Sequence, residues 1–577
     1  MLKDKLLVGS VALVFLIILV FGQTFRFGMI SLDDVYYITD NKMLWTARPL
    51  EFITWSFGSS YQSVWAPLVW CSYYLDGFLY STTSGFHLTN VILHALSSLL
   101  VYRFFLKATN EWVPSFILSC VFAIHPLQVE AVTWLSGRKD CLSSVFFFIT
   151  LNFYQSYCSS GKTLYYYFGV FTFILSLLAK QMAVTLPFVL VLIEVWPLHR
   201  VILPAEMRGV FLSIIESLWK KKAFLIVAVI ASLAPIWAHY FNHTISSENT
   251  LSFIDRLILI PAFYLHYIKS FFYPVGLTLH PIAEIGQVPM AVSILGLVIL
   301  LTASATTLYF YKIKPCYAVG WFWFVGTLVP VIGIIPFGAF PIGDRYMYLP
   351  IIGIAIIMAW GLFSIKFWIS RKIVYSGAIL IPTILISLAI KQVSVWRNDT
   401  SLWEYSLRVN PNSLFFNERL VYAFLVAKEY SKAIKFLEDL KIEKSVGLLT
   451  FYGRALVETH QLDKGIAKFE EASRLDPNYF YAVKRLGNAL LQNQEYGRAI
   501  EVLNRALNLL PHQDSTERNL VLYYLSLAYI ESNQIENLVS LIALYKPQSI
   551  EVKISECRKQ SNLEDCRRLV KDLFVLP

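Results

Sequence analysis

Two adjacent carboxylates are the first residues along the chain that could do chemistry. Asp33 and Asp34, in SLDDVYYI, directly follow the apolar run Phe27 to Leu32. This position suits the outer boundary of a membrane, where an ionised group is costly unless it is paired or used. A carboxylate there can act as a general base that takes the proton of an acceptor hydroxyl. We therefore predict that Asp33 or Asp34 is a base; the alternative is a solvated start of a loop.

A second polar segment, HPLQVEAVTWLSGRKD, lies between two apolar runs that carry almost no charge. A hairpin between membrane spans needs only one or two polar residues, whereas this one contains a histidine, two acids and two bases. We predict that His125 or Glu130 assists acid–base chemistry. Arg138 either binds a phosphate or pairs with an aspartate, and Asp140 supports the site.

Two further cations lie in predicted outward turns. Lys180, in LLAKQMAV, interrupts two apolar segments and suits an anionic lipid headgroup; the alternative is that it only marks a short loop. Arg345, in PIGDRYMYLP, is flanked by Asp344 and Tyr346, and its alternative role is an ion pair with Asp344 that seals a helix end. Together with Arg138, these cations are predicted to bind a donor phosphate, with Asp344 and Tyr346 as supporting residues.

The composition indicates what kind of protein must hold these side chains. Of 577 residues, 56% are hydrophobic and 15% are charged, whereas soluble domains are about one quarter charged. This balance excludes a water-soluble enzyme and indicates a membrane protein. The net charge of +10 comes largely from short Lys and Arg clusters between apolar runs, which is typical of topology signals and not of a nucleic-acid-binding surface. The seven cysteines show no metal-ligand spacing.

Hydropathy predicts about eleven segments that cross the membrane, whose hydrocarbon layer is about 30 Å thick. They occupy residues 6–22, 86–106, 112–125, 141–158, 164–179, 181–197, 223–240, 290–311, 317–338, 347–365 and 373–390. Alternate threading places the basic clusters around 103–107, 200–222, 312–314 and 366–372 in the cytoplasm, provided that residues 256–274 re-enter or lie in the interface. The polar segments described above then all face outward.

Two groups of residues in this part are predicted to have structural roles. Trp55, Trp65 and Trp70, in the first outward loop, are expected to anchor amphipathic helices in the membrane interface. His87, Asn90 and His94 lie at helical spacing on one stripe of a span. We expect these three to form hydrogen bonds with a neighbouring helix.

A second domain is predicted over residues 395–577, where charges become interleaved with Leu, Ala and Tyr. When GIAKFEEASRLDPN is aligned with AIEVLNRALNLLPH, Gly465 and Ala499 are 34 residues apart, and so are Pro477 and Pro511. This is the period of the tetratricopeptide repeat, in which helical hairpins stack into an α-solenoid. The two central units are clear, and degenerate units on either side bring the array to about three or four.

The threading places this second domain on the periplasmic or lumenal side, so the chain is predicted to be an integral protein of a bacterial inner membrane or of the endoplasmic reticulum. Cys557 and Cys566, nine residues apart near the C-terminus, would then lie in an oxidising compartment. They either form a disulfide or remain two free thiols.

The order of these motifs resembles a known family. SLDDVYYI after the first span, FHLTNVILHAL, HPLQVEAVTWLSGRKD, DRYMYLP, and VWRNDTSLWEYSLRVNPNS before the repeats are together similar to the transmembrane and tetratricopeptide repeat-containing protein O-mannosyltransferases and their prokaryotic relatives. The resemblance covers nearly the whole chain. It implies an all-α fold, with a polytopic GT-C glycosyltransferase bundle over residues 1–394 followed by the repeat solenoid over residues 395–577.

The resemblance also implies an activity. An inverting glycosyltransferase would move a mannose-like sugar from a polyprenyl-phosphate carrier to a hydroxyl, such as a Ser or Thr of a protein, at the outer face of the bilayer. An aspartate of the first outward loop would be the base, which corresponds to Asp33 or Asp34. The repeats would recruit a protein or glycan acceptor, and no cofactor, metal or nucleic acid is expected. The repeat array is shorter than that of the animal relatives, which leaves the acceptor open.

Two alternatives follow from the same residues. A transferase that modifies a glycolipid or a cell-surface polysaccharide would use its repeats to recruit a biosynthetic partner. A non-catalytic membrane scaffold would use them to gather an envelope complex, and would not require Asp33, Glu130 or Arg138. A transporter is disfavoured because no inverted repeat of spans is visible.

Overall fold

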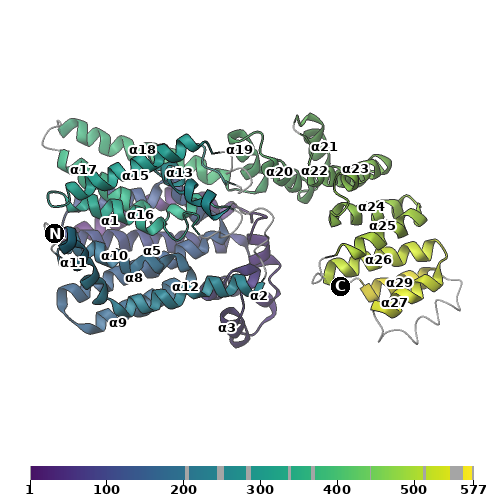
Figure 1. The fold of residues 1–577 in the computed structure, drawn as a ribbon, viewed down its shortest axis with the longest axis horizontal. Coiled ribbons are helices and arrows are strands. Elements are labelled where there is room, and N and C mark those ends of the chain that lie inside the picture. Colours follow the sequence, from purple (N-terminus) through teal and green to yellow (C-terminus); the bar gives the residue numbers. More distant parts are fainter. Residues whose placement is uncertain are drawn as a thin grey trace. The chain divides into compact units, whose positions relative to one another are not determined.

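The computed structural model describes residues 2–201, 207–242, 252–280, 288–334, 340–365, 371–441, 443–510, 515–545 and 563–574 (Figure 1). Over these ranges the regular secondary structure is helical, and an isolated bridge joins His280 to Ile342. The all-α prediction is therefore confirmed. The chain divides into two compact units, Met1–Val409 and Asn410–Pro577, and each is described by itself.

The first unit contains the polar segments singled out from the sequence. Its described helices are α1 (Leu2–Phe21), α2 (Lys42–Thr46), α3 (Pro49–Gly58), α4 (Pro67–Leu79), α5 (Thr83–Thr109), α6 (Trp112–Ile124), α7 (Val129–Thr133), α8 (Arg138–Ser160), α9 (Thr163–Ala179), α10 (Leu186–Val195), α11 (Met207–Trp219), α12 (Lys222–Asn242), α13 (Phe253–Phe272), α15 (Met290–Tyr309), α16 (Pro315–Leu328), α17 (Ile351–Ile365), α18 (Arg371–Val395) and α19 (Asp399–Val409). The short helical turns Val35–Thr39, Leu135–Gly137 and Asp344–Met347 lie beside or contain predicted site residues.

Small hydroxyl residues hold α8 against α9. The side chains of Ser143 and Ser176 form a hydrogen bond of 3.0 Å, and those of Thr150 and Thr172 one of 2.8 Å. Small polar residues let two apolar helices approach closely and satisfy each other's hydrogen bonds without water. Because α8 also packs against α5, its first turn, which begins at Arg138, has a fixed position in the bundle.

Fewer helices are long enough to cross a membrane than the hydropathy predicted. Within the described ranges, the candidates are Leu2–Arg26, Thr83–Thr109 and Met290–Tyr309. A bent pair, Trp112–Ile124 and Pro126–Thr133, passes the same test together across a bend of 50°. Shorter apolar helices cover further predicted segments, such as Thr163–Ala179. The predicted segments 223–240 and 373–390 lie within α12 and α18, which have 21 and 25 residues. In the described part of the chain, the prediction of about eleven spans is thus corrected to three helices that qualify by length and composition, or four with the bent pair.

Residues 256–274, which were predicted to re-enter or to lie in the interface, form most of α13. This helix is not among the candidate spans of the described ranges. Its two faces differ, since Leu257 and Ile258 are exposed whereas Phe263 and Tyr267 are buried. The interfacial placement of α13 stays a prediction.

The first outward loop has an aromatic core of its own. Trp70 is 1% exposed; it packs edge-on against Tyr37, with ring centroids 5.0 Å apart, and lies 6.2 Å from the ring of Trp55. The prediction that Trp70 anchors the loop in the membrane interface is therefore wrong, because its ring is enclosed by protein. The exposed apolar side chains of this loop include Leu50 on α3 and Phe78 on α4. This core fixes the position of the first outward loop, in which Asp33 and Asp34 precede the aromatic residues.

The second unit is built from helical hairpins. Its described helices are α20 (Leu414–Val426), α21 (Tyr430–Asp439), α22 (Val446–Glu458), α23 (Leu462–Leu475), α24 (Phe480–Gln492), α25 (Tyr496–Asn508), α26 (Ser515–Glu531), α27 (Ile535–Tyr545) and α29 (Leu563–Phe574). α22 and α24 begin at Val446 and Phe480, and α23 and α25 begin at Leu462 and Tyr496, so successive hairpins are offset by 34 residues. The repeat period found in the sequence is therefore the period of the structure.

A glycine allows the close approach of α22 and α23. A Cβ atom on Gly465 would lie 2.6 Å from the Val457 side chain and 3.0 Å from the Gly453 carbonyl oxygen, so only a residue without a side chain fits there. Near the C-terminus, Cys566 is disulfide-bonded. Cys557, with which it was predicted to pair, lies outside the described residues.

Candidate functional site

Asp34 joins two segments that are far apart in the sequence. Its side chain is buried, and its carboxylate accepts hydrogen bonds from the Ile30 N–H (3.0 Å), the Ser136 N–H (2.9 Å) and the Ser136 hydroxyl (2.6 Å). Burial raises the pKa of Asp34 from its ordinary value to about 7, although these hydrogen bonds act in the opposite direction. With both oxygens engaged, Asp34 positions the turn before α8.

Asp33 is placed differently. Its side chain is only half-buried and, in the part of the chain that the structure describes, forms no hydrogen bond or ion pair. The carbonyl oxygen of Asp33 accepts a hydrogen bond from the Tyr37 N–H at 2.9 Å, which fixes the backbone. The carboxylate of Asp33 is thus positioned but unoccupied, as a general base must be.

Glu130 and Arg345 form a buried ion pair between α7 and the Asp344–Met347 turn. Glu130 also accepts a hydrogen bond from the Arg345 backbone N–H at 3.1 Å, so both of its oxygens contact Arg345. The guanidinium lies 5.4 Å from the centroid of the Trp134 ring and 4.8 Å from that of Tyr346. This ion pair joins the segment HPLQVEAVTWLSGRKD to the segment DRYMYLP. Both carboxylate oxygens of Glu130 are occupied by Arg345.

Arg345 does not pair with its neighbour Asp344, which was the alternative considered from the sequence; its partner among the described residues is Glu130. Asp344 is buried, and burial raises its pKa well above the usual value. The negative charge of Glu130 acts in the same direction, whereas Arg345 lowers it. Tyr346 accepts a hydrogen bond from the Arg345 guanidinium at 3.3 Å, in keeping with a supporting position.

Lys180 and Asp140 form a second ion pair, with 2.5 Å between Nζ and Oδ1. The Lys180 ammonium also lies 5.6 Å from the centroid of the Tyr346 ring, so it is adjacent to the Arg345 group. The other oxygen of Asp140, Oδ2, is buried without a hydrogen-bond partner. A buried carboxylate oxygen without a partner is costly unless a ligand supplies a donor.

Arg138 is completely buried and fully occupied. It forms an ion pair of 2.6 Å with Asp76, and it donates hydrogen bonds to Asn90, to the Ser72 hydroxyl at 3.2 Å and to the Phe86 carbonyl oxygen at 2.8 Å. Of the two roles considered from the sequence, phosphate binding or pairing with an aspartate, the structure shows the second. Burial raises the pKa of Asp76, while Arg138 lowers it.

His125 is also held by structural contacts. Its Nε2 lies 2.9 Å from the Phe271 carbonyl oxygen, its Nδ1 accepts a hydrogen bond from the Leu127 N–H at 3.2 Å, and its ring stacks on that of Phe271. Both ring nitrogens are therefore used where α6 meets the following turn. The contacts of His125 do not connect it to Asp33.

The polar stripe of α5 forms the predicted hydrogen bonds. Asn90 donates to the Trp134 carbonyl oxygen at 3.1 Å, and the two ring nitrogens of His94 lie 2.7 Å from the Tyr348 hydroxyl and 2.9 Å from the Ala123 carbonyl oxygen. His87 differs, since its Nε2 lies 3.4 Å from the Gly28 carbonyl oxygen and its Nδ1 is buried without a hydrogen-bond partner in the described part of the chain. The predicted bonds to a neighbouring helix are thus confirmed for His94, which contacts Ala123 of α6, and for Asn90, which also donates to Val132 of α7.

The remaining charged side chains of the site lie around Lys139. Burial lowers the pKa of Lys139; Asp33 and Asp140 raise it, and Arg345 and Lys180 lower it further. Contacts also place these five charged residues together, because Lys139 and Asp33 both contact Tyr37, whereas Lys180, the ion-pair partner of Asp140, and Arg345 both lie against the Tyr346 ring. We name these five residues, together with Glu130, the Lys139 cluster. It brings together Asp33, Lys180 and Arg345, as the sequence predicted, but includes Lys139 where Arg138 was expected.

A glycine lets the chain turn into this cluster. A Cβ atom on Gly137 would lie 2.2 Å from the Ala131 carbonyl oxygen, so this turn tolerates no side chain. Sequence reasoning missed Asp76, Ser136 and the role of Lys139. A signal for Asp76 existed, since it is a single acid within an otherwise apolar helix, Pro67–Leu79, of the first outward loop.

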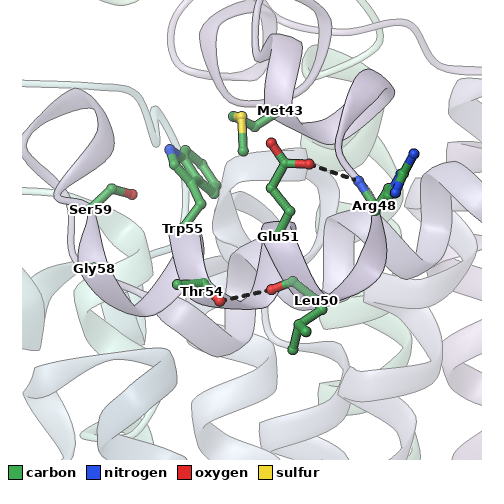
Figure 2. Close-up of a pocket in the computed structure, with 8 residues that line it drawn as sticks. All are labelled: Met43, Arg48, Leu50, Glu51, Thr54, Trp55, Gly58 and Ser59. Atoms are coloured by element: carbon green, nitrogen blue, oxygen red, sulfur yellow. Dashed lines mark hydrogen bonds between the residues drawn. The ribbon is translucent and has the colours of Figure 1, made fainter.

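A separate pocket of about 740 Å³ lies on α2 and α3 (Figure 2). Its lining residues are Met43, Arg48, Leu50, Glu51, Thr54, Trp55, Gly58 and Ser59. Figure 2 shows Glu51 contacting the backbone of Arg48, which closes the N-terminal end of α3. The predicted site residues do not line this pocket.

Comparison with known proteins agrees with both units. Residues 453–514 match a family model described as tetratricopeptide repeat, which confirms the predicted repeats. Protein O-mannosyl-transferase TMTC3 of Mus musculus is 23% identical over 556 residues, which cover 83% of this chain and 58% of that protein. Protein O-mannosyl-transferase TMTC2 of Mus musculus is 32% identical over 143 residues, covering 23% of this chain and 17% of that protein.

Among solved structures, the one titled crystal structure of YrrB, a TPR protein with an unusual peptide-binding site, matches 31% of this chain and 92% of its own at 16% identity, with a TM-score of 0.23. The comparisons confirm the resemblance stated from the sequence motifs, and the chain is a membrane protein with tetratricopeptide repeats. It spans 58% of the length of the TMTC3 relative that it matches.

Proposed function

We propose that the chain is an inverting GT-C glycosyltransferase. It transfers a mannose-like sugar from a polyprenyl-phosphate carrier to a hydroxyl group, preferably of a Ser or Thr side chain of a protein. The relatives that match most of this chain are named protein O-mannosyl-transferases. The observation that carries the proposal is the unoccupied Asp33 carboxylate, held among paired and unpaired cations of the Lys139 cluster.

The chemistry requires one base and a stabilised leaving group. Asp33 takes the proton of the acceptor hydroxyl, whose oxygen forms a bond to the anomeric carbon from the face opposite the lipid phosphate. The bond between that carbon and the phosphate oxygen breaks, and the electron pair leaves with the lipid phosphate. A single displacement inverts the anomeric centre. Lys180 and Arg345, fixed by Asp140 and Glu130, stabilise the negative charge that develops on the phosphate.

The proposal needs no metal or other cofactor, because side-chain cations can stabilise the departing phosphate. The active site and the repeats face the periplasm or the endoplasmic reticulum lumen in this proposal. The disulfide of Cys566 supports an oxidising compartment for the second unit. That unit recruits the acceptor, since tetratricopeptide repeats form extended binding surfaces.

The test uses the purified full-length protein in lipid nanodiscs with synthetic polyprenyl-phosphate mannose and a Ser/Thr-rich protein acceptor. We expect release of lipid phosphate together with a sugar adduct on the intact acceptor, measured by mass spectrometry. Release only with a glycolipid or polysaccharide acceptor would support the alternative transferase. A lack of release with every polyprenyl-phosphate sugar and acceptor would contradict the proposal and favour a scaffold.

A further inference from the structure

We propose that Lys139 is the side chain that binds the phosphate of the lipid-linked donor. This inference rests on the proposed function and changes the residue assigned to that role. From the sequence, this role was assigned to its neighbour Arg138 and none was assigned to Lys139, whereas the contacts of the two residues favour Lys139.

Arg138 cannot bind a donor phosphate without losing its place in the fold. Its side chain has no exposed surface. Its three nitrogens are directed to Asp76, Asn90, Ser72 and the Phe86 carbonyl oxygen. An arginine that is already paired with a carboxylate and buried on all sides is a structural anchor.

Lys180 and Arg345 each have a carboxylate partner, Asp140 and Glu130. Lys139 differs from them. In the described part of the chain its ammonium forms no hydrogen bond and no ion pair, and it lies 5.5 Å from the centroid of the Tyr37 ring. A half-buried ammonium without an anion is unfavourable, because burial removes part of its hydration. An anionic ligand would remove this penalty.

The base and the free cation are supported by the same tyrosine. The Tyr37 N–H binds the Asp33 carbonyl oxygen, and the Tyr37 ring faces the Lys139 ammonium. The negative charge of Asp33 raises the pKa of Lys139, but the two side chains form no hydrogen bond or ion pair with each other among the described residues. An acceptor hydroxyl at Asp33 and a departing phosphate at Lys139 would occupy the two ends of the displacement.

The unpaired oxygen of Asp140 is a second, independent sign that a polar ligand belongs here. Asp140 is 3% exposed, and its Oδ2 has no hydrogen-bond partner. Asp140 follows Lys139 on the first turn of α8 and is close enough to influence its charge. A sugar hydroxyl can donate to this oxygen while the phosphate of the same donor contacts Lys139.

The kinetic test compares Lys139→Gln with Lys42→Gln, which removes an exposed lysine from the first outward loop. We expect kcat/KM for polyprenyl-phosphate mannose to fall about 100-fold in Lys139→Gln, with an unchanged KM for the acceptor. Lys139→Arg should recover part of the loss because it restores a cation. Lys42→Gln should match the wild type. A Lys139→Gln variant within about threefold of the wild-type value would overturn the inference.

A binding measurement separates this inference from the proposed function. Native mass spectrometry of the full chain is carried out with a polyprenyl phosphate and with the polyprenol of the same length. Lys139→Gln should lose affinity for the phosphate but keep that for the alcohol. If the wild type transfers sugar and the variant keeps its phosphate affinity, only the role of Lys139 is wrong. If the wild type binds the lipid phosphate through Lys139 but transfers no sugar, the proposed function fails and the phosphate site remains.

Discussion

Arg138 and Lys139 are neighbours in the sequence but belong to two different regions of the first unit. Arg138 lies in a closed region, where Asp76, Asn90 and Ser72 take up its donors. Lys139 lies near Asp33, and neither of these partly buried charged groups has a hydrogen bond or ion pair among the described residues. The comparison shows that buried charged groups serve two purposes here. Groups whose donors and acceptors all have partners join helices, and groups without a partner among the described residues are left for a ligand.

The largest effect is expected when the buried ion pair between Arg138 and Asp76 is broken. Arg138→Ala leaves Asp76 buried without its cation, and breaking a buried ion pair costs about 3–5 kcal/mol. We expect poor yield and a strongly lowered apparent melting temperature in detergent. The double variant Arg138→Met with Asp76→Asn removes both charges and should recover part of the stability. A stable, folded Arg138→Ala protein would show that this region is not an anchor.

The next effect distinguishes the two adjacent aspartates. Asp33→Asn removes the base without disturbing a contact, so we expect turnover to fall about 10²- to 10⁴-fold with an unchanged apparent melting temperature. Asp34→Asn should instead lower the melting temperature, because its amide group cannot accept every hydrogen bond that the carboxylate accepts. Lipid phosphate release and thermal unfolding measure the two quantities. Equal loss of turnover at unchanged stability in both variants would contradict the distinction.

A smaller effect is expected in the second unit, where close packing takes the place of charge pairing. Gly465→Ala should destabilise the α22–α23 hairpin by about 1–3 kcal/mol, because the added Cβ overpacks the contact. Gly497→Ala is the matched control, since a Cβ atom there meets no atom within 4 Å. Hydrogen–deuterium exchange of the full chain should show faster exchange over residues 446–475 only in Gly465→Ala. Equal exchange in both variants would contradict the packing argument.

The last prediction concerns pH. The pKa of Asp34 is about 7 in the folded protein and near 3.8 when the group is free, so the folded state binds more protons between these values. Ionisation of Asp34 therefore opposes folding, and stability should decrease as the pH rises from about 4 to about 7. Asp34→Asn removes this contribution. Apparent melting temperatures of the two proteins should converge with rising pH, and parallel curves would refute the assignment.

The sequence predicted where the polar segments lie along the chain better than it predicted which of their side chains form ion pairs and hydrogen bonds. Asp33, Lys180 and Arg345 were assigned to one site, and their charges do act on a common neighbour. Arg138 was assigned to the same site, but successive residues on an α-helix point about 100° apart. Arg138 therefore contacts α4 and α5, whereas Lys139 lies over Tyr37 in the Val35–Thr39 turn. Hydropathy identified the apolar runs, but only three helices of the described ranges, or four with the bent pair, qualify as spans by length and composition.

By itself, the sequence determined that the chain is an apolar helical protein, that its last third repeats every 34 residues, and which segments carry unusual charge. These properties depend on composition and on spacing along the chain. Only the tertiary structure decided which charges are paired, because the partners are remote: Arg138 and Asp76 are 62 positions apart, and Arg345 and Glu130 are 215 apart. No local pattern encodes a contact at that separation, so the unpaired state of Asp33 and Lys139 became visible only once the helices were packed.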